Sequence, residues 1–222
     1  LGAAHKNLGQ IELASEAFKK VTELNPNFAD GFNNLGISLK DQEKIDKALE
    51  AFKKALLIKP DYPEVYNNIG NAFKYQNKFK EAIEAYEKAI SLKPDYADAY
   101  NNMGVALKDK GSFKEAIKAY NKALTIKPDY AEAHCNKGIT LQKLGEFEEA
   151  KLSLGTAISI KPNNSENYFN IGIILQDQDK LDEATLSYKH AILYDPNHAE
   201  SYYNMGDCFK KQGNLSDAIV AY

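Results

Sequence analysis

Apolar residues recur along the chain with the spacing of amphipathic helices, in pairs of segments. Within residues 63–96, a first stripe follows an i, i+3, i+4, i+7 pattern, which lines one face of an α-helix: Tyr66, Ile69, Gly70 and Phe73. After a polar break at 76–78, a second segment carries a similar stripe. It ends before Pro94, because proline cannot continue a helix. The pattern predicts two antiparallel helices joined by a short turn.

The paired pattern recurs every 34 residues. Three residue types keep this step independently, at Pro26, Pro60, Pro94, Pro128, Pro162 and Pro196, at Gly2, Gly36, Gly70, Gly104, Gly138, Gly172 and Gly206, and at Ala14, Ala48, Ala82, Ala116, Ala150, Ala184 and Ala218. When the proline is counted as the thirty-second position, there are five full repeats: 29–62, 63–96, 97–130, 131–164 and 165–198. Residues 1–28 and 199–222 are partial repeats, so we expect a single repeat array over 1–222.

Fixed small and large residues indicate how the helices pack. Gly at the eighth position and Ala at the twentieth leave room for two helices to approach closely. A large residue at the twenty-fourth position, usually Phe or Tyr, is expected to fill the space between adjacent repeats. The turn at the fifteenth position holds Gly, Asn or Asp, which tolerate positive φ, except at Glu43. One hairpin cannot bury this surface alone, so the repeats must stack.

These positions resemble the signature of the tetratricopeptide repeat (TPR) family over all 222 residues. The fourth position is aromatic in most repeats, at Phe32, Tyr66, Tyr100, Tyr168 and Tyr202. An apolar seventh residue, the eighth Gly, the twentieth and twenty-seventh Ala and the proline complete the match. The resemblance implies an all-α superhelical solenoid of antiparallel helix pairs, whose first helices line a concave groove that holds a partner peptide.

The face of each first helix opposite its apolar stripe is expected to line that groove. Its candidate peptide-binding residues are polar and periodic: Asn33, Asn34, Asn67, Asn68, Asn101, Asn102, Asn136, Asn170, Asn204, Lys40, Lys74 and Lys108. An amide offers donors and an acceptor, so a ladder of Asn could grip an extended backbone. The array is similar to the asparagine-lined groove in the TPR region of protein O-GlcNAc transferases. Alternatively, Asn is simply a common polar residue in TPR grooves.

The second position of every repeat is acidic: Asp30, Glu64, Asp98, Glu132, Glu166 and Glu200. These carboxylates either stabilise the helix N-terminus or form a row of acidic side chains along the groove, opposite the lysines. The carboxylate clamp of some TPR co-chaperones needs Lys at position two and Arg at position six. Acidic residues and Asn occupy those positions here, so that mode of binding is not expected.

Composition narrows the possible functions. A formal net charge of −3 and a pI near 5.9 argue against a nucleic-acid-binding surface. The longest apolar run, 171–175, is too short for a membrane span. Cys135 and Cys208 form no short motif, which argues against a disulfide framework and favours a reducing, cytoplasmic compartment. The chain does not begin with Met, so it is expected to be a fragment.

No catalytic residues, metal site or cofactor are predicted, because the four histidines have no ligand-type spacing with Cys or carboxylates. The sequence therefore predicts a non-enzymatic protein–protein interaction module that binds an extended peptide or partner segment in its groove. A second hypothesis is a substrate-recruiting arm of a larger enzyme, such as a glycosyltransferase. End-to-end self-association is a third, since neither end has a polar capping helix.

Repeat 131–164 is predicted to be the least stable. His134 replaces the fourth-position aromatic residue, Lys137 replaces the apolar seventh residue, and Gly155 lies inside the second helix. A glycine there costs about 1 kcal/mol relative to Ala. Backbone amides of this repeat should therefore exchange with solvent deuterium faster than those of 63–96. Equal protection in the two repeats would refute the prediction.

Overall fold

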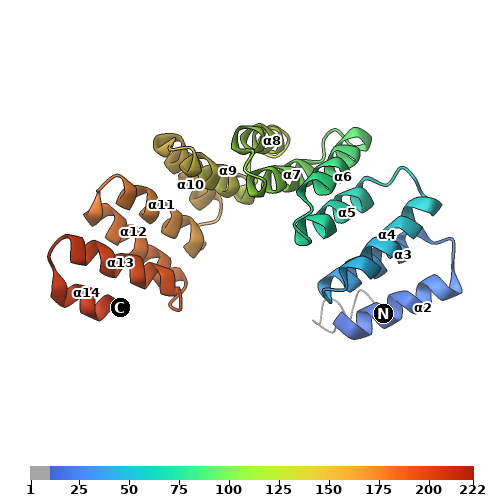
Figure 1. Ribbon diagram of the computed structural model, residues 1–222, viewed down its shortest axis with the longest axis horizontal. Coiled ribbons are helices and arrows are strands. Elements are labelled where there is room, and N and C mark those ends of the chain that lie inside the picture. The colour runs from blue at the N-terminus through green and yellow to red at the C-terminus, as the bar shows by residue number, and fades with distance from the viewer. Residues whose placement is uncertain (1–10) are drawn as a thin grey trace. The chain divides into compact units, whose positions relative to one another are not determined.

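The computed structural model describes residues 11–222, which form thirteen helices and no strand (Figure 1). The first helices of the repeats are α3 (Ala29–Asp41), α5 (Pro63–Tyr75), α7 (Ala97–Asp109), α9 (Ala131–Lys143), α11 (Ser165–Asp177) and α13 (Ala199–Lys211). The second helices are α2 (Ile11–Leu24), α4 (Ile45–Ile58), α6 (Phe79–Leu92), α8 (Phe113–Ile126), α10 (Phe147–Ile160), α12 (Leu181–Tyr194) and α14 (Leu215–Ala221). The predicted all-α fold of helix pairs is confirmed.

The helix boundaries follow the 34-residue step. Each first helix begins at the first position of its repeat, and α3, α5 and α7 each contain 13 residues. The second helices α4 and α6 contain 14 residues. Lys93 follows α6 in an extended conformation (φ −139°, ψ 87°), as the steric demand of the next residue, Pro94, requires. Proline therefore sets the end of each hairpin.

The turn within each hairpin depends on one residue with positive φ at the fifteenth position. In the described turns, φ lies between 57° and 87° at Glu43, Asn77, Gly111, Gly145, Asp179 and Gly213. Glu43 adopts the same conformation as the glycines, although its side chain disfavours it. The backbone geometry is thus constant and the residue type is not.

The chain divides into two compact units, one ending at Ser112 and the other beginning at Phe113. In the first unit, α3 packs against α4 and α5, and α5 packs against α6 and α7. In the second, α11 packs against α9, α10, α12 and α13. Within the units, then, α3, α5, α9 and α11 each contact both their own partner helix and the next first helix. The single array over 1–222 remains a prediction.

Five of the hairpins close around a glycine at the eighth position. The twenty-fourth side chain of the same repeat rests against it in the pairs Gly36–Phe52, Gly70–Tyr86, Gly138–Leu154, Gly172–Tyr188 and Gly206–Tyr222. A β-carbon on Gly36 would lie 2.5 Å from a ring carbon of Phe52, so only glycine fits. Phe52 is fully buried and also belongs to a core cluster with Val65 and Ile69 of the next repeat. The large residue therefore fills the interior of its own hairpin as well as the space between repeats.

Two glycines of repeat 131–164 should respond to the same substitution in opposite directions. Added β-carbons on Gly145 and Gly155 would meet no atom within 4 Å, so any effect is conformational. Gly145 has φ 76°, and Gly145→Ala should lower the free energy of unfolding by about 1 kcal/mol. Gly155 lies inside α10, and Gly155→Ala should raise the free energy of unfolding by about 1 kcal/mol. Urea denaturation measures both, and shifts of the same sign would contradict this account.

Candidate functional site

The side of the first helices opposite their apolar stripe is the candidate site. We call it the first-helix face and define it as positions two, five, six, nine, twelve and thirteen of α3, α5, α7, α9, α11 and α13. It is treated separately in each unit. The stacking of α3 on α5 and of α5 on α7 makes it continuous within the first unit.

Asparagine side chains link neighbouring repeats in the first unit. The Asn68 amide donates a hydrogen bond of 2.9 Å to the Asn33 oxygen, and the Asn102 amide donates one of 3.0 Å to the Asn67 oxygen. The sixth position of one repeat is thus bonded to the fifth position of the preceding repeat. Because the partners lie 35 residues apart, each bond fixes the spacing of two first helices.

The two asparagine positions differ in exposure. At the fifth position Asn33, Asn67 and Asn101 are buried, with 8%, 6% and 0% of their surface exposed. The Asn33 and Asn67 amides thus join neighbouring repeats, and peptide binding by the three fifth-position residues stays a prediction.

The sixth position keeps its polar groups near the surface. Five of its asparagines are half-buried: Asn34, Asn68, Asn102, Asn136 and Asn204. Asn170 differs, because it is buried and donates to the Glu166 carbonyl of its own helix at 2.8 Å. An amide has two N–H donors and an acceptor oxygen, so a bond such as that from Asn68 leaves further capacity.

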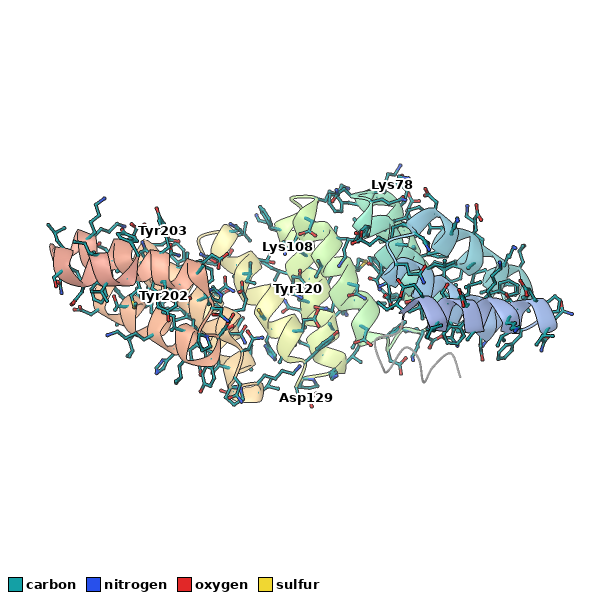
Figure 2. All side chains as sticks on the ribbon, turned by 90° about the horizontal axis from the view of Figure 1, so that it is seen from below. Lys78, Lys108, Tyr120, Asp129, Tyr202 and Tyr203 are labelled. Carbon is teal, nitrogen blue, oxygen red and sulfur yellow. The ribbon has the colours of Figure 1, made fainter. Side chains whose placement is uncertain are left out.

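The lysines at position twelve lie beside carboxylates of the same helix. Lys40 is 3.2 Å from Asp41, and Lys108 is 3.4 Å from Asp109. Figure 2 shows Lys108 among the side chains of its unit. Lys74 is half-buried at the corresponding place on α5. Such partly exposed pairs are worth little, so a partner's charges could replace them at low cost.

Carboxylates at position two bind the last residue of their own repeat. The Tyr62 hydroxyl donates to Asp30 at 2.8 Å, and His198 lies 3.4 Å from Glu166. Burial, and then the hydrogen bond to Asp30, raise the pKa of Tyr62 to about 12. These contacts show that position two has a structural use beyond the charge it places at a helix N-terminus.

Tyrosines at the twenty-fourth position reach through the hairpin to the first-helix face. The hydroxyls of Tyr86 and Tyr222 donate to Asn71 and Asp207 at position nine, each at 2.7 Å. Burial raises the pKa of Tyr86. The hydroxyl therefore stays protonated near neutral pH and orients the Asn71 amide.

Sequence reasoning missed an aromatic part of the face in the second unit. The fifth position changes from Asn to Phe169 on α11 and Tyr203 on α13. Consecutive Tyr202 and Tyr203 leave different sides of α13, and 59% of Tyr203 is exposed (Figure 2). A cavity of about 300 Å³ is lined by Phe169, Ala199, Glu200, Tyr203 and Asn204. The sequence does contain a signal for this part of the face, because Phe169 and Tyr203 occupy the fifth position, which is Asn in the earlier repeats.

Residues 11–222 contain no group of three or more His, Cys, Asp or Glu that could hold a metal ion. Cys135 and Cys208 are not joined in a disulfide bond. No helix in the same range has the length and apolar character needed to cross a membrane.

Solved structures share this fold. A crystal structure of MamA is 29% identical with a TM-score of 0.64, and the match covers 73% of this chain and 95% of MamA. YrrB is 24% identical with a TM-score of 0.65, over 84% of this chain and 96% of YrrB. PilW, a type IV pilus biogenesis factor, is 22% identical with a TM-score of 0.80, over 87% of this chain and 90% of PilW. These similarities do not show a resemblance to O-GlcNAc transferases, which stays a prediction.

Family models match along most of the sequence. A model described as TPR repeat matches residues 37–75, 70–111, 106–145 and 174–213. Models described as tetratricopeptide repeat match 131–164, 17–50 and 1–28. No curated protein is similar enough in sequence to be counted as a relative. The repeat models and the helix-pair architecture agree, and the chain therefore belongs to the tetratricopeptide repeat family.

Proposed function

We propose that the first-helix face binds an extended segment of another protein. The observation that carries the proposal is the row of half-buried amides at position six of the first unit, Asn34, Asn68 and Asn102, at a fixed 34-residue step. A row of this kind matches a ligand that presents polar groups repeatedly along its length. An extended polypeptide does so, because each residue except proline offers one N–H and one C=O.

Preorganisation favours such binding. The bonds Asn68–Asn33 and Asn102–Asn67 hold the exposed amides in place before a partner arrives. Little side-chain entropy is then lost on association, and lost entropy is a main cost of binding. Each hydrogen bond to the partner backbone would add about 0.5–1.5 kcal/mol. Affinity would come from several modest bonds of low sequence specificity.

The second unit has a cavity of its own that would hold a side chain of a partner protein. The cavity beside Phe169 and Tyr203 combines aromatic walls with the polar groups of Glu200 and Asn204. An apolar side chain of the partner fits this combination, because buried aromatic contacts contribute strongly at protein interfaces. In this proposal each unit is a site by itself: the first unit holds a peptide backbone, and the second binds a segment that carries an apolar residue.

A peptide as the ligand class also has support among proteins of the same fold. YrrB is described in the report of its structure as a TPR protein with an unusual peptide-binding site. The alternative of a substrate-recruiting arm of a larger enzyme uses the same surface and differs only in what the recruited segment meets next. No described residue favours it over a simple interaction module.

Alanine at three position-six residues of the first unit tests the proposal. Short peptides selected from a random display library on the wild-type chain serve as probes, and their dissociation constants are measured by fluorescence anisotropy. Asn34→Ala/Asn68→Ala/Asn102→Ala should weaken binding by about tenfold or more, since up to three backbone hydrogen bonds are lost. Unchanged affinity of all selected peptides would contradict the proposal.

A matched control variant and a measurement of folding together distinguish the loss of peptide contacts from the loss of structure. Asn121 and Asn163 are exposed and lie outside the first-helix face. Asn121→Ala/Asn163→Ala should therefore leave the dissociation constants unchanged. The triple variant removes two inter-repeat bonds, so its far-ultraviolet circular dichroism and urea midpoint must show that it remains folded under the binding conditions.

A further inference from the structure

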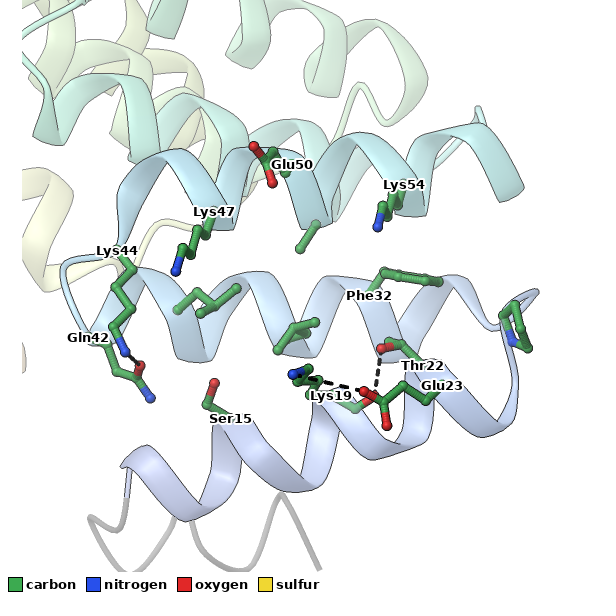
Figure 3. Close-up of a pocket in the computed structure, with 14 residues that line it drawn as sticks. Ser15, Lys19, Thr22, Glu23, Phe32, Gln42, Lys44, Lys47, Glu50 and Lys54 are labelled. Carbon is green, nitrogen blue, oxygen red and sulfur yellow. Dashed lines mark hydrogen bonds and ion pairs between the residues drawn. The ribbon is translucent and has the colours of Figure 1, made fainter.

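A second hollow lies on the other side of the repeats, away from the first-helix face. It is a cavity of about 720 Å³ between α2 and α4, with α3 as its floor (Figure 3). Its lining consists of Ser15, Lys19, Thr22, Glu23, Pro26, Phe32, Leu35, Leu39, Gln42, Lys44, Lys47, Glu50, Ala51 and Lys54, which we call the outer hollow. Its volume is within the range of cavities that hold ligands, about 300–1,000 Å³.

The floor of the outer hollow is apolar. Phe32, Leu35 and Leu39 occupy positions four, seven and eleven of the repeat, on the α3 side opposite the asparagines. All three are only partly buried, although they belong to the apolar stripe that normally packs inside. The hollow thus exposes part of a helix face that a partner side chain could cover.

The rim of the outer hollow is basic, although the whole chain has a net charge of −3. Four lysines and two glutamates line the cavity. Lys44 donates to the Gln42 side chain, and Lys54 lies 5.8 Å from the centre of the Phe32 ring. Among residues 11–222, no carboxylate lies within 4.0 Å of the Lys47 or Lys54 amine. Figure 3 shows both lysines reaching from α4 toward the floor.

Lys47 departs from the pattern of the other repeats. It occupies position nineteen, in the first turn of α4, where later repeats place acidic residues: Glu81, Glu115, Glu149, Glu183 and Asp217. A helix N-terminus carries partial positive charge, so a lysine there costs about 0.3–1 kcal/mol relative to an acid. Stability therefore does not account for Lys47, whereas attraction of an anionic ligand does.

We propose that the outer hollow binds a short acidic segment of a partner protein. One or two apolar side chains of the segment pack on Leu35 and Leu39, and its carboxylates face Lys47 at one end and Lys54 at the other. The site is separate from the first-helix face and takes a different ligand class, so it does not depend on the function proposed above. The interaction weakens with salt, because its charges are exposed at the rim.

The test uses the whole chain and a fluorescein-labelled peptide that alternates Asp or Glu with Leu or Phe. Fluorescence anisotropy should show saturable binding that declines as sodium chloride is added. Lys47→Glu/Lys54→Glu should weaken binding by about tenfold or more. Lys47→Glu restores the residue type found in the later repeats, whereas Lys54→Glu places an acid late in α4, so the urea midpoint of the double variant must show that it is folded under the binding conditions.

Three controls test whether the acidic peptide binds in the outer hollow. Lys114→Glu/Lys122→Glu makes the same charge change at exposed positions of α8 and should leave binding unchanged. A peptide of equal charge with Ser in place of Leu and Phe should bind about tenfold more weakly if the apolar floor contributes. Asn34→Ala/Asn68→Ala/Asn102→Ala should bind the acidic peptide as the wild type does.

The proposal is overturned if the Lys114/Lys122 variant weakens binding as much as the Lys47/Lys54 variant. It is also overturned if the Ser peptide binds equally well, or if the asparagine variant loses the acidic peptide. Equally tight binding of a single-stranded oligonucleotide that depends on Lys47 and Lys54 would assign the hollow to nucleic acid instead.

Discussion

A side chain of the second helix occupies the space where the first helix has only a glycine, and the remaining architecture depends on this fit. Within the two units the pair is Gly36–Phe52, Gly70–Tyr86, Gly138–Leu154, Gly172–Tyr188 or Gly206–Tyr222. It brings the two backbones close enough for the twentieth alanine to be buried, as Ala48 and Ala82 are. The same large residue meets the next repeat, so hairpin closure and repeat stacking share one contact.

This fit also shapes the polar surface. At three of the twenty-fourth positions a Tyr hydroxyl donates to a polar side chain on the first-helix face, in the pairs Tyr86–Asn71, Tyr188–Gln176 and Tyr222–Asp207. Paired asparagines of successive repeats then set the spacing of that face. The candidate binding surface is therefore built partly from the groups that hold the repeats together. A substitution at Asn68 affects both roles, which is why its test needs a measure of folding.

Most of the fold could be predicted from sequence, because each boundary has a local cause. Pro94 ends a helix, and residues such as Asn77 and Gly111 adopt the positive φ that the turn needs. The site was less predictable. Period alone places Asn67 and Asn68 side by side, yet a helix turns them by about 100°, so one is buried and the other is not. The exposure of Tyr203, the cavity beside Phe169 and the hollow beside Lys47 depend on packing across repeats, which no short sequence motif predicts.

The central claim is that glycine at the eighth position is required by the side chain that lies against it. The most direct test is the effect of Gly70→Ala on the free energy of unfolding, measured in the wild type and in a Tyr86→Ala background. The account predicts a loss of about 2 kcal/mol in the wild type, because the added methyl group overlaps the Tyr86 ring. In the Tyr86→Ala background the same change should be neutral or stabilising, since alanine favours a helix over glycine by about 1 kcal/mol. Equal losses in both backgrounds would contradict the account.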